Sequence, residues 1–196
     1  ALEGLEMKST ASLPPVQRRA LGWVVAAALA AAPGVADGLR VGAGGSLSLG
    51  GGRLSLACGD LAIDGTLQVG GGAIAAARDV TSAGSLEGGT GAIGIRGDFA
   101  SSPTSFTAGT GVVRFEDGCG RTAWVIREPL TFAELEASTS SGKRLRLPAT
   151  EETVVVARLD LAGQPAARLA LSSGTPGAAA LLKLEAGGSQ ELSAIE

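Results

Sequence analysis

Four aspartates recur at a fixed interval and are the first candidates for chemistry in this sequence. If residues one repeat apart lie side by side, their carboxylates form a column, and hard cations such as Ca²⁺ bind several carboxylate oxygens at once. Aspartate side chains also accept hydrogen bonds from backbone amides at chain corners, and that role needs no metal. We favour the corner role and keep a calcium-binding ladder as the alternative. The aspartates are Asp60, Asp79, Asp98 and Asp117, which are evenly spaced, and the arginines that recur beside them and could offset their charge are Arg78, Arg96 and Arg114.

The composition disfavours most kinds of catalytic and metal site. The chain of 196 residues has no histidine, and histidine is the commonest general base and metal ligand. Carboxylate pairs could still hydrolyse glycosides, as they do on some solenoid scaffolds, but no aromatic residues that would line a sugar-binding cleft accompany them. The formal charge is −3, and there is no basic cluster of the kind that nucleic-acid binding requires. We therefore predict no catalytic residues, no cofactor and no nucleic-acid partner.

A regular sequence repeat must position these side chains. Four segments align, GSLSLGGGRL, GTLQVGGGAI, GSLEGGTGAI and TSFTAGTGVV, and they start at Gly45, Gly65, Gly84 and Thr104. Each repeat carries three apolar anchors at nearly even spacing. The three series of anchors are Leu47, Leu67, Leu86 and Phe106; Leu54, Ile74, Ile93 and Val113; and Leu61, Val80 and Phe99.

This pattern predicts an all-β fold, a parallel β-solenoid with about 20 residues per coil. We expect a signal-peptide helix to precede the solenoid. Three anchors per period indicate three short strands per coil with the anchors pointing inward. The glycines between the anchors indicate sharp corners, often with positive φ. A β-sandwich is the alternative, but its strands would not reproduce the same glycine pattern four times. We expect regular coils over residues 37–121, a less regular continuation over 122–196, and about eight coils in a rod roughly 40 Å long.

The two cysteines, Cys58 and Cys119, do not fit a strict stack. Two cysteines in an exported protein usually pair, but about three coils separate these two, which corresponds to roughly 14 Å. A disulfide requires Cα atoms within about 7 Å. Either the loop over residues 116–121 folds back over the stack, or the thiols are free, or the assumed register is wrong. We favour a disulfide.

The first 36 residues have the pattern of a short extension followed by a secretory signal peptide. Lys8, Arg18 and Arg19 precede an uncharged run over 20–36, which ends in Gly-Val-Ala. That run is shorter than the roughly 20 apolar residues that span a bilayer. We predict export, cleavage after Ala36 and no membrane span in the mature chain, which would remain mildly acidic.

One stretch resembles a family of exported bacterial proteins. The segment GDFASSPTSFTAGTGVVRFEDGCG, followed by LTFAELEASTSSGKRLRLPA, is similar to β-strand-repeat proteins in which GD…F-x-AGTG-x-V-x-F leads into TF-x-x-L. The likeness covers residues 41–149 and is most specific over 106–120. Some of these proteins carry an exosortase-linked sorting signal of the IPTL or PEP type, with a membrane span and a basic tail, and no such tail occurs before Glu196. The resemblance implies export and a structural role, and it transfers no catalytic residue.

Together these patterns predict a secreted or surface-displayed structural or adhesive module without catalysis. Its expected partners are cell-surface polysaccharides or other envelope proteins, and its oligomeric state stays open. The alternative is a carbohydrate-active enzyme or a polysaccharide-binding module on the same scaffold. Convergent carboxylates with an aromatic platform would favour the enzyme, whereas a smooth convex surface would favour the structural role.

Overall fold

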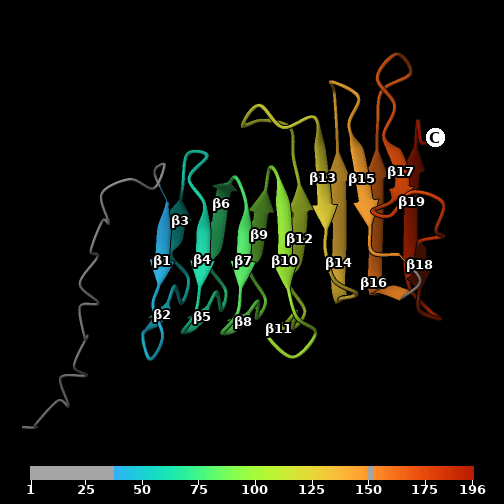
Figure 1. Cartoon of the computed structure of the whole chain (residues 1–196). Coiled ribbons are helices and arrows are strands. Elements are labelled where there is room, and N and C mark those ends of the chain that lie inside the picture. Colours follow the sequence, from blue (N-terminus) through green and yellow to red (C-terminus); the bar gives the residue numbers. More distant parts are fainter. Residues whose placement is uncertain (1–37, 150–151) are drawn as a thin grey trace, which may run out of the picture.

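The chain folds as a parallel β-solenoid, as the repeat predicted (Figure 1). The computed structural model describes residues 38–149 and 152–196, which form strands and turns and contain no helix that could span a membrane. The predicted signal peptide and its cleavage site lie outside the described residues. Every pairing between the named strands is parallel.

The strands form three sheets along the axis of the solenoid. Sheet A has seven strands: β1 (Leu39–Val41), β4 (Leu61–Ile63), β7 (Val80–Ser82), β10 (Asp98–Ser101), β13 (Ala123–Ile126), β15 (Arg144–Leu147) and β17 (Ala170–Ser173). Sheet B has four: β2 (Ser46–Ser48), β5 (Thr66–Gln68), β8 (Ser85–Glu87) and β11 (Phe106–Thr107). Sheet C has eight: β3 (Arg53–Ser55), β6 (Ala73–Ala77), β9 (Ala92–Ile95), β12 (Val112–Phe115), β14 (Thr131–Ser138), β16 (Glu152–Ala162), β18 (Leu181–Leu184) and β19 (Ser189–Ser193).

Successive strands of sheet A mark seven levels, which we number from β1 to β17. Levels 1 to 4 have three strands each, and levels 5 to 7 have strands only in sheets A and C. Seven levels correspond to about six turns of about 22 residues each, so the expected count of eight coils was too high. Six spacings of about 4.8 Å give a rod about 29 Å long, shorter than the expected length of roughly 40 Å.

The anchors of each series stack in register, and this stacking makes the core. In sheet B, Leu47 pairs with Leu67, Leu67 with Leu86, and Leu86 with Phe106. The side chains of Leu67 and Leu86 are fully buried. Burying such a side chain contributes about 1.5–3 kcal/mol, so each level stabilises the next through its inward residues. The predicted solenoid is therefore confirmed, and the β-sandwich alternative is wrong.

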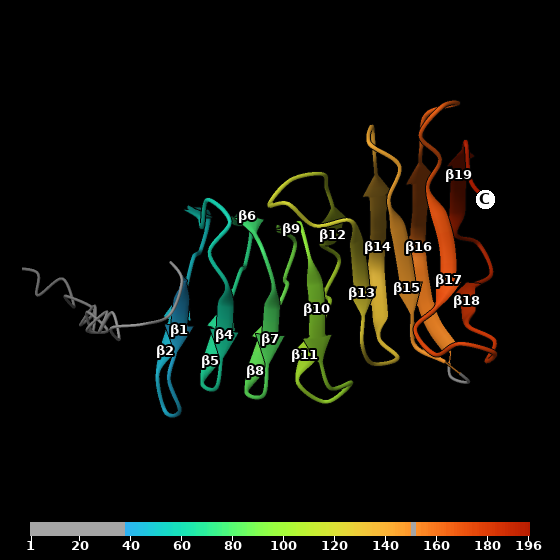
Figure 2. The same cartoon turned by 45° about the horizontal axis from the view of Figure 1, so that its top comes forward.

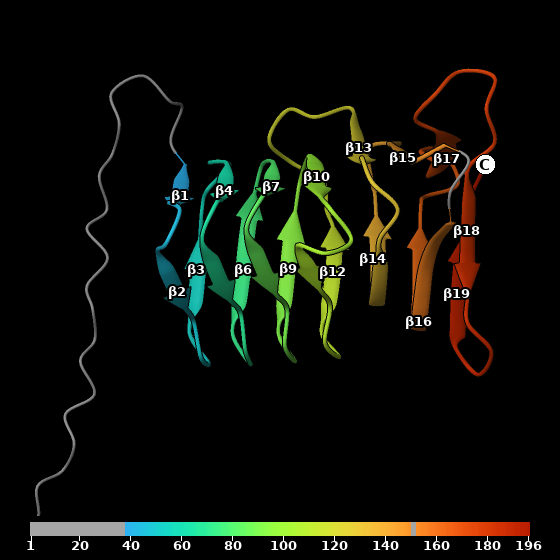
Figure 3. The same cartoon turned by 60° about the horizontal axis from the view of Figure 1, so that its bottom comes forward.

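The cross-section changes after level 4, where sheet B ends. Figure 3 shows the strands of sheet C side by side across this change. Beyond it the strands of sheet C lengthen, to 8 residues in β14 and 11 in β16. All four phenylalanines of the chain lie near this transition, and three of them, Phe99, Phe106 and Phe132, have ring centroids 5.2–6.1 Å apart. Their large rings fill the interior where the three-sided coil becomes two-sided.

A column of glycines turns the chain at the corner between sheets B and C. Gly70, Gly89 and Gly109 have φ of +62°, +65° and +67°, a region that L-residues disfavour. They also stack directly, because a Cβ on Gly89 would lie 2.5 Å from the carbonyl oxygen of Gly70. Glycine is therefore required at this corner both by the backbone angle and by the close approach of the next level.

Two matched substitutions separate the two reasons for glycine at this corner: the cost of a positive φ for any other residue, and the clash of a Cβ with the neighbouring level. Gly50 begins the same column with φ of +60°, but a Cβ there would meet nothing within 4 Å. We expect Gly50→Ala to lower the free energy of unfolding by about 1–2 kcal/mol, and Gly89→Ala to lower it by roughly a further 1–3 kcal/mol because of overpacking. Urea unfolding measures both, and equal losses would contradict the stacked corner.

Candidate functional site

Three of the four recurrent aspartates form a column at the corner between sheets C and A. Asp60, Asp79 and Asp98 each stand immediately before the paired residues Leu61, Val80 and Phe99. The backbone N–H of Asp79 donates to Oδ1 of Asp60 at 3.3 Å, and the N–H of Asp98 donates to Oδ1 of Asp79 at 2.8 Å. Asp60 and Asp79 therefore each bind the amide of the next aspartate, which is the corner role that the sequence favoured.

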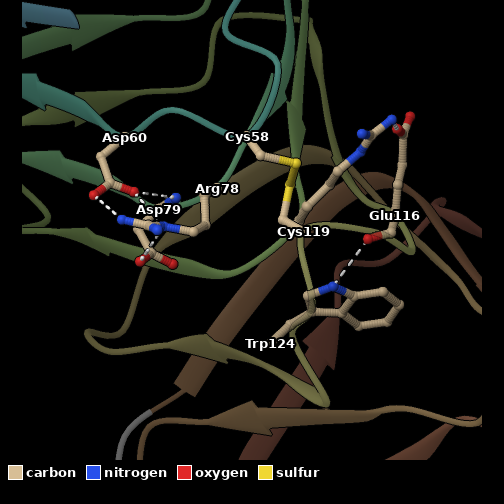
Figure 4. Close-up of a disulfide and its surroundings, with 8 residues drawn as sticks. Cys58, Asp60, Arg78, Asp79, Glu116, Cys119 and Trp124 are labelled. Atoms are coloured by element: carbon tan, nitrogen blue, oxygen red, sulfur yellow. Dashed lines mark hydrogen bonds and ion pairs between the residues drawn. A yellow bond between two sulfur atoms is a disulfide. The ribbon is translucent and has the colours of Figure 1, made fainter. Parts of the chain in front are cut away.

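Each carboxylate of the column also faces a guanidinium group. Arg78 donates from Nε and Nη2 to both oxygens of Asp60, at 2.8 and 2.5 Å (Figure 4). Arg121 pairs with Asp79, and Nη2 of Arg127 lies 2.5 Å from Asp98. The hydrogen bond to Asp60, followed by the charge of that carboxylate, raises the pKa of Arg78. Arginine is charged at neutral pH in any case.

The other two recurrent arginines serve different partners. Arg96 lies 3.9 Å from Glu116, and Arg114 pairs with Glu136 on the neighbouring strand. Only Arg78 therefore offsets the aspartate column in the way that the sequence suggested. Arg121 and Arg127, which lie outside the repeat, neutralise the rest of the column.

Asp117 does not belong to the column, contrary to the sequence expectation. It follows β12 and accepts hydrogen bonds from the turn of the next level, with Thr139 Oγ1 at 3.0 Å and the N–H of Ser140 at 2.8 Å. Nζ of Lys143 lies 3.5 Å away. Partial burial would raise the pKa of Asp117, but the bonds from Ser140 and Thr139 and the charge of Lys143 together lower it.

The four aspartates therefore do not form the column of carboxylates that a calcium-binding ladder requires. One of its four carboxylates lies elsewhere, and the other three already have cationic partners. Among residues 38–149 and 152–196, no three acidic or cysteine side chains converge in a group that could hold a metal ion.

A disulfide joins Cys58 to Cys119, with Cα atoms 5.4 Å apart. Cys58 follows β3 in level 1, whereas Cys119 lies in the loop of residues 116–122 that follows β12 in level 4. Of the three alternatives drawn from the sequence, the structure has the first: the loop bends back over the preceding levels (Figure 2). This loop lengthens the connection to the next level, so the step along the chain from Phe99 to its partner Ile126 is longer than the step from Val80 to its partner Phe99.

Contacts at three levels hold the disulfide loop against the stack. Arg121 reaches Asp79, and Gly118 packs so closely on Arg96 that a Cβ there would lie 2.8 Å from its Cδ. At the start of the loop, the carbonyl oxygen of Glu116 accepts a hydrogen bond of 3.1 Å from Nε1 of the buried Trp124 (Figure 4). The loop therefore acts as a covalent strap across the first four levels.

Lys143 is a buried cation beside this strap. Its side chain is 4% exposed, and Nζ lies 4.8 Å from the centroid of the Trp124 ring. Burial lowers the pKa of Lys143, and the charge of Asp117 acts in the opposite direction. The pairing of Lys143 with Asp117 and the indole face compensates part of the cost of burying its charge.

A group of arginines on the outer face of sheet A was not predicted from the sequence. Arg144 and Arg146 alternate with the buried Leu145 and Leu147 along β15 and are exposed. Two shallow hollows of about 250 and 380 Å³ adjoin them, and these hollows share Thr122, Ala123 and Arg146. The alternation in KRLRL does predict outward arginines, but other members of the group come from distant segments. The arginines that line the two hollows are Arg121, Arg127, Arg144, Arg146 and Arg168.

No protein-family model, curated protein or solved structure matches this chain. The likeness to exported β-strand-repeat proteins therefore stays a prediction.

The strap predicts a large effect of reduction on stability. We expect the variant with both Cys58→Ser and Cys119→Ser to lose about 2–4 kcal/mol of unfolding free energy, because the bond closes a long loop. Denaturant unfolding measures this loss. Limited proteolysis should cut residues 116–122 faster in that variant than in the oxidised protein. Equal stability and equal cleavage would contradict the strap.

Proposed function

We propose that this chain is an exported structural or adhesive module, secreted or displayed at a bacterial surface, whose activity lies in its shape and outer surface rather than in catalysis. The observation that carries the proposal is the disulfide between level 1 and the loop after level 4. Disulfides persist in oxidising compartments such as the periplasm and the cell exterior. A bond that links levels so far apart in sequence suits a protein that works outside the cytoplasm.

The charged side chains support a structural role because many of them link neighbouring levels. Arg127 of level 5 reaches Asp98 of level 4, and Lys183 of level 7 lies 3.8 Å from Glu152 of level 6. Exposed pairs of this kind contribute about 0–1 kcal/mol each. A series of them along the axis, together with the strap, would keep the levels in register. The carboxylates of the aspartate column, which could have served a reaction, are paired here with arginines.

The N-terminal segment supplies the second line of support. Its basic residues, uncharged run and small residues before Ala36 have the order expected of a secretory signal. Export through such a signal would deliver the chain to the compartment that the disulfide requires. Envelope proteins or surface polysaccharides would then be the partners within reach of its flat faces.

Expression of the whole chain in a bacterial host tests this proposal. We expect the protein outside the cytoplasm, beginning at Asp37, with Cys58 and Cys119 oxidised in non-reducing mass spectrometry. A control variant with Val24→Glu and Leu29→Glu should stay in the cytoplasm, because charges interrupt the apolar run. A wild-type chain retained in the cytoplasm with its first 36 residues intact would refute export.

A further inference from the structure

The outer face of sheet A in levels 5 to 7 forms a shallow groove with arginines in its middle. Two rows of residues cross this face in register: Ala123, Arg144 and Ala170 in one row, and Val125, Arg146 and Ser172 in the other. Each arginine of β15 therefore stands between shorter side chains. The long side chains of Arg144 and Arg146 project beyond their shorter neighbours, and the two hollows adjoin them.

Arginines from neighbouring segments extend the groove. Arg168, just before β17, lines the hollow of about 250 Å³, and Arg121 and Arg127, at the two ends of β13, line the hollow of about 380 Å³. Because Arg146 lines both hollows, they form one surface that crosses β13, β15 and β17, or roughly 10 Å of sheet, and also reaches Asp98 at the start of β10. Such an open and extended surface suits a chain lying across it better than an enclosed small molecule.

The charge of this groove is not satisfied within the protein. Among the described residues, Arg144, Arg146 and Arg168 have no ion pair, whereas seven other arginines do. Two acidic residues also line the hollows, but Asp98 is paired with Arg127, which leaves Glu196 as the opposing carboxylate. Three guanidinium groups without an ion pair therefore share the groove with one unpaired side-chain carboxylate, and this excess of positive charge is available for an anionic partner.

From this arrangement we infer that the arginine groove binds an acidic polysaccharide, a sugar chain that carries carboxylate groups. The inference rests on the proposed function, since it needs an exported protein that meets such chains. Guanidinium groups bind carboxylates with two parallel hydrogen bonds. Arg144 and Arg146 lie two residues apart on one strand, or roughly 7 Å, so they can hold two carboxylates of one extended chain.

Nucleic acid fits the groove less well. Single strands are held by aromatic side chains that stack on bases, but the phenylalanines and Trp124 among the described residues are buried. Duplexes carry one charge per about 1.7 Å, whereas this chain has a net charge of −3 and only a small cationic area. Sparser anions, such as the carboxylates of a polyuronate, match three available arginines better.

Affinity electrophoresis and calorimetry with the oxidised protein test the inference, with polygalacturonate as the probe. We expect binding that weakens as salt is added, no binding to neutral dextran, and weaker binding to single-stranded DNA than to polygalacturonate. Heparin, which carries sulfates as well as carboxylates at a higher charge density, serves as a comparison: tighter binding to heparin would mean that the groove responds to charge density alone and would overturn the carboxylate assignment, whereas equal or weaker binding would support it.

Matched variants locate the site. Arg144→Ala with Arg146→Ala should weaken polygalacturonate binding about 10- to 100-fold, and the two Arg→Lys changes should restore only part of it. Arg53 also has no ion pair among the described residues but lies on sheet C, so Arg53→Ala should leave binding unchanged. All these residues are exposed, and an unchanged thermal midpoint verifies the fold of each variant.

The outcomes separate this inference from the proposed function. The polysaccharide-binding inference fails, and the proposed function stands, if the exported, oxidised protein binds no polygalacturonate. The same holds if it binds polygalacturonate equally well without Arg144 and Arg146. Tighter binding to single-stranded DNA assigns the face to nucleic acid and overturns the polysaccharide. Retention in the cytoplasm overturns the proposed function, whatever the groove binds.

Discussion

In-register pairing between parallel strands is the constraint on which the rest of this structure depends. No single level buries its own apolar residues or satisfies its own backbone, so each level is completed by its neighbours. Because pairing is parallel and in register, like positions lie above like positions. Leu67 therefore packs on Leu86, Gly89 turns above Gly70, and Asp79 donates its amide to Asp60. One rule of pairing thus produces the core, the corners and the polar column.

Departures from the rule concentrate after level 4 and give the protein its particular features. Sheet B ends there, the aromatic residues gather inside, and the longer connection before β13 returns over the stack to bring Cys119 to Cys58. The same connection supplies Arg121 to Asp79. Beyond it sheet A presents outward arginines between short side chains. The regular half thus resembles a plain rod, whereas the irregular half carries the strap and the groove.

The regular half was predictable from the sequence because periodicity reports in-register stacking directly. The anchors through Val113, the glycine corners and the corner role of Asp60 followed from spacing alone. The period could not reveal that Asp117 lies outside the column. The extra residues between β12 and β13 separate Asp117 from the next strand of sheet A, so that Val125 and not Asp117 pairs with Asp98. Nor could it find the partner of Asp79, because Arg121 is distant in sequence and lies in a loop that has no repeat. The groove was missed for a related reason: five arginines scattered over 121–168 gather only when three levels are stacked.

The register itself can be measured by nuclear magnetic resonance of the methyl groups. Leu67 and Leu86 are paired neighbours, whereas Leu47 and Leu86 are two levels apart, or about 9.6 Å. Stacked levels predict strong methyl–methyl Overhauser effects between Leu67 and Leu86, and between Leu47 and Leu67, with none between Leu47 and Leu86. Absence of the Leu67–Leu86 effect, in a folded protein whose leucine methyls are assigned, would contradict the in-register solenoid.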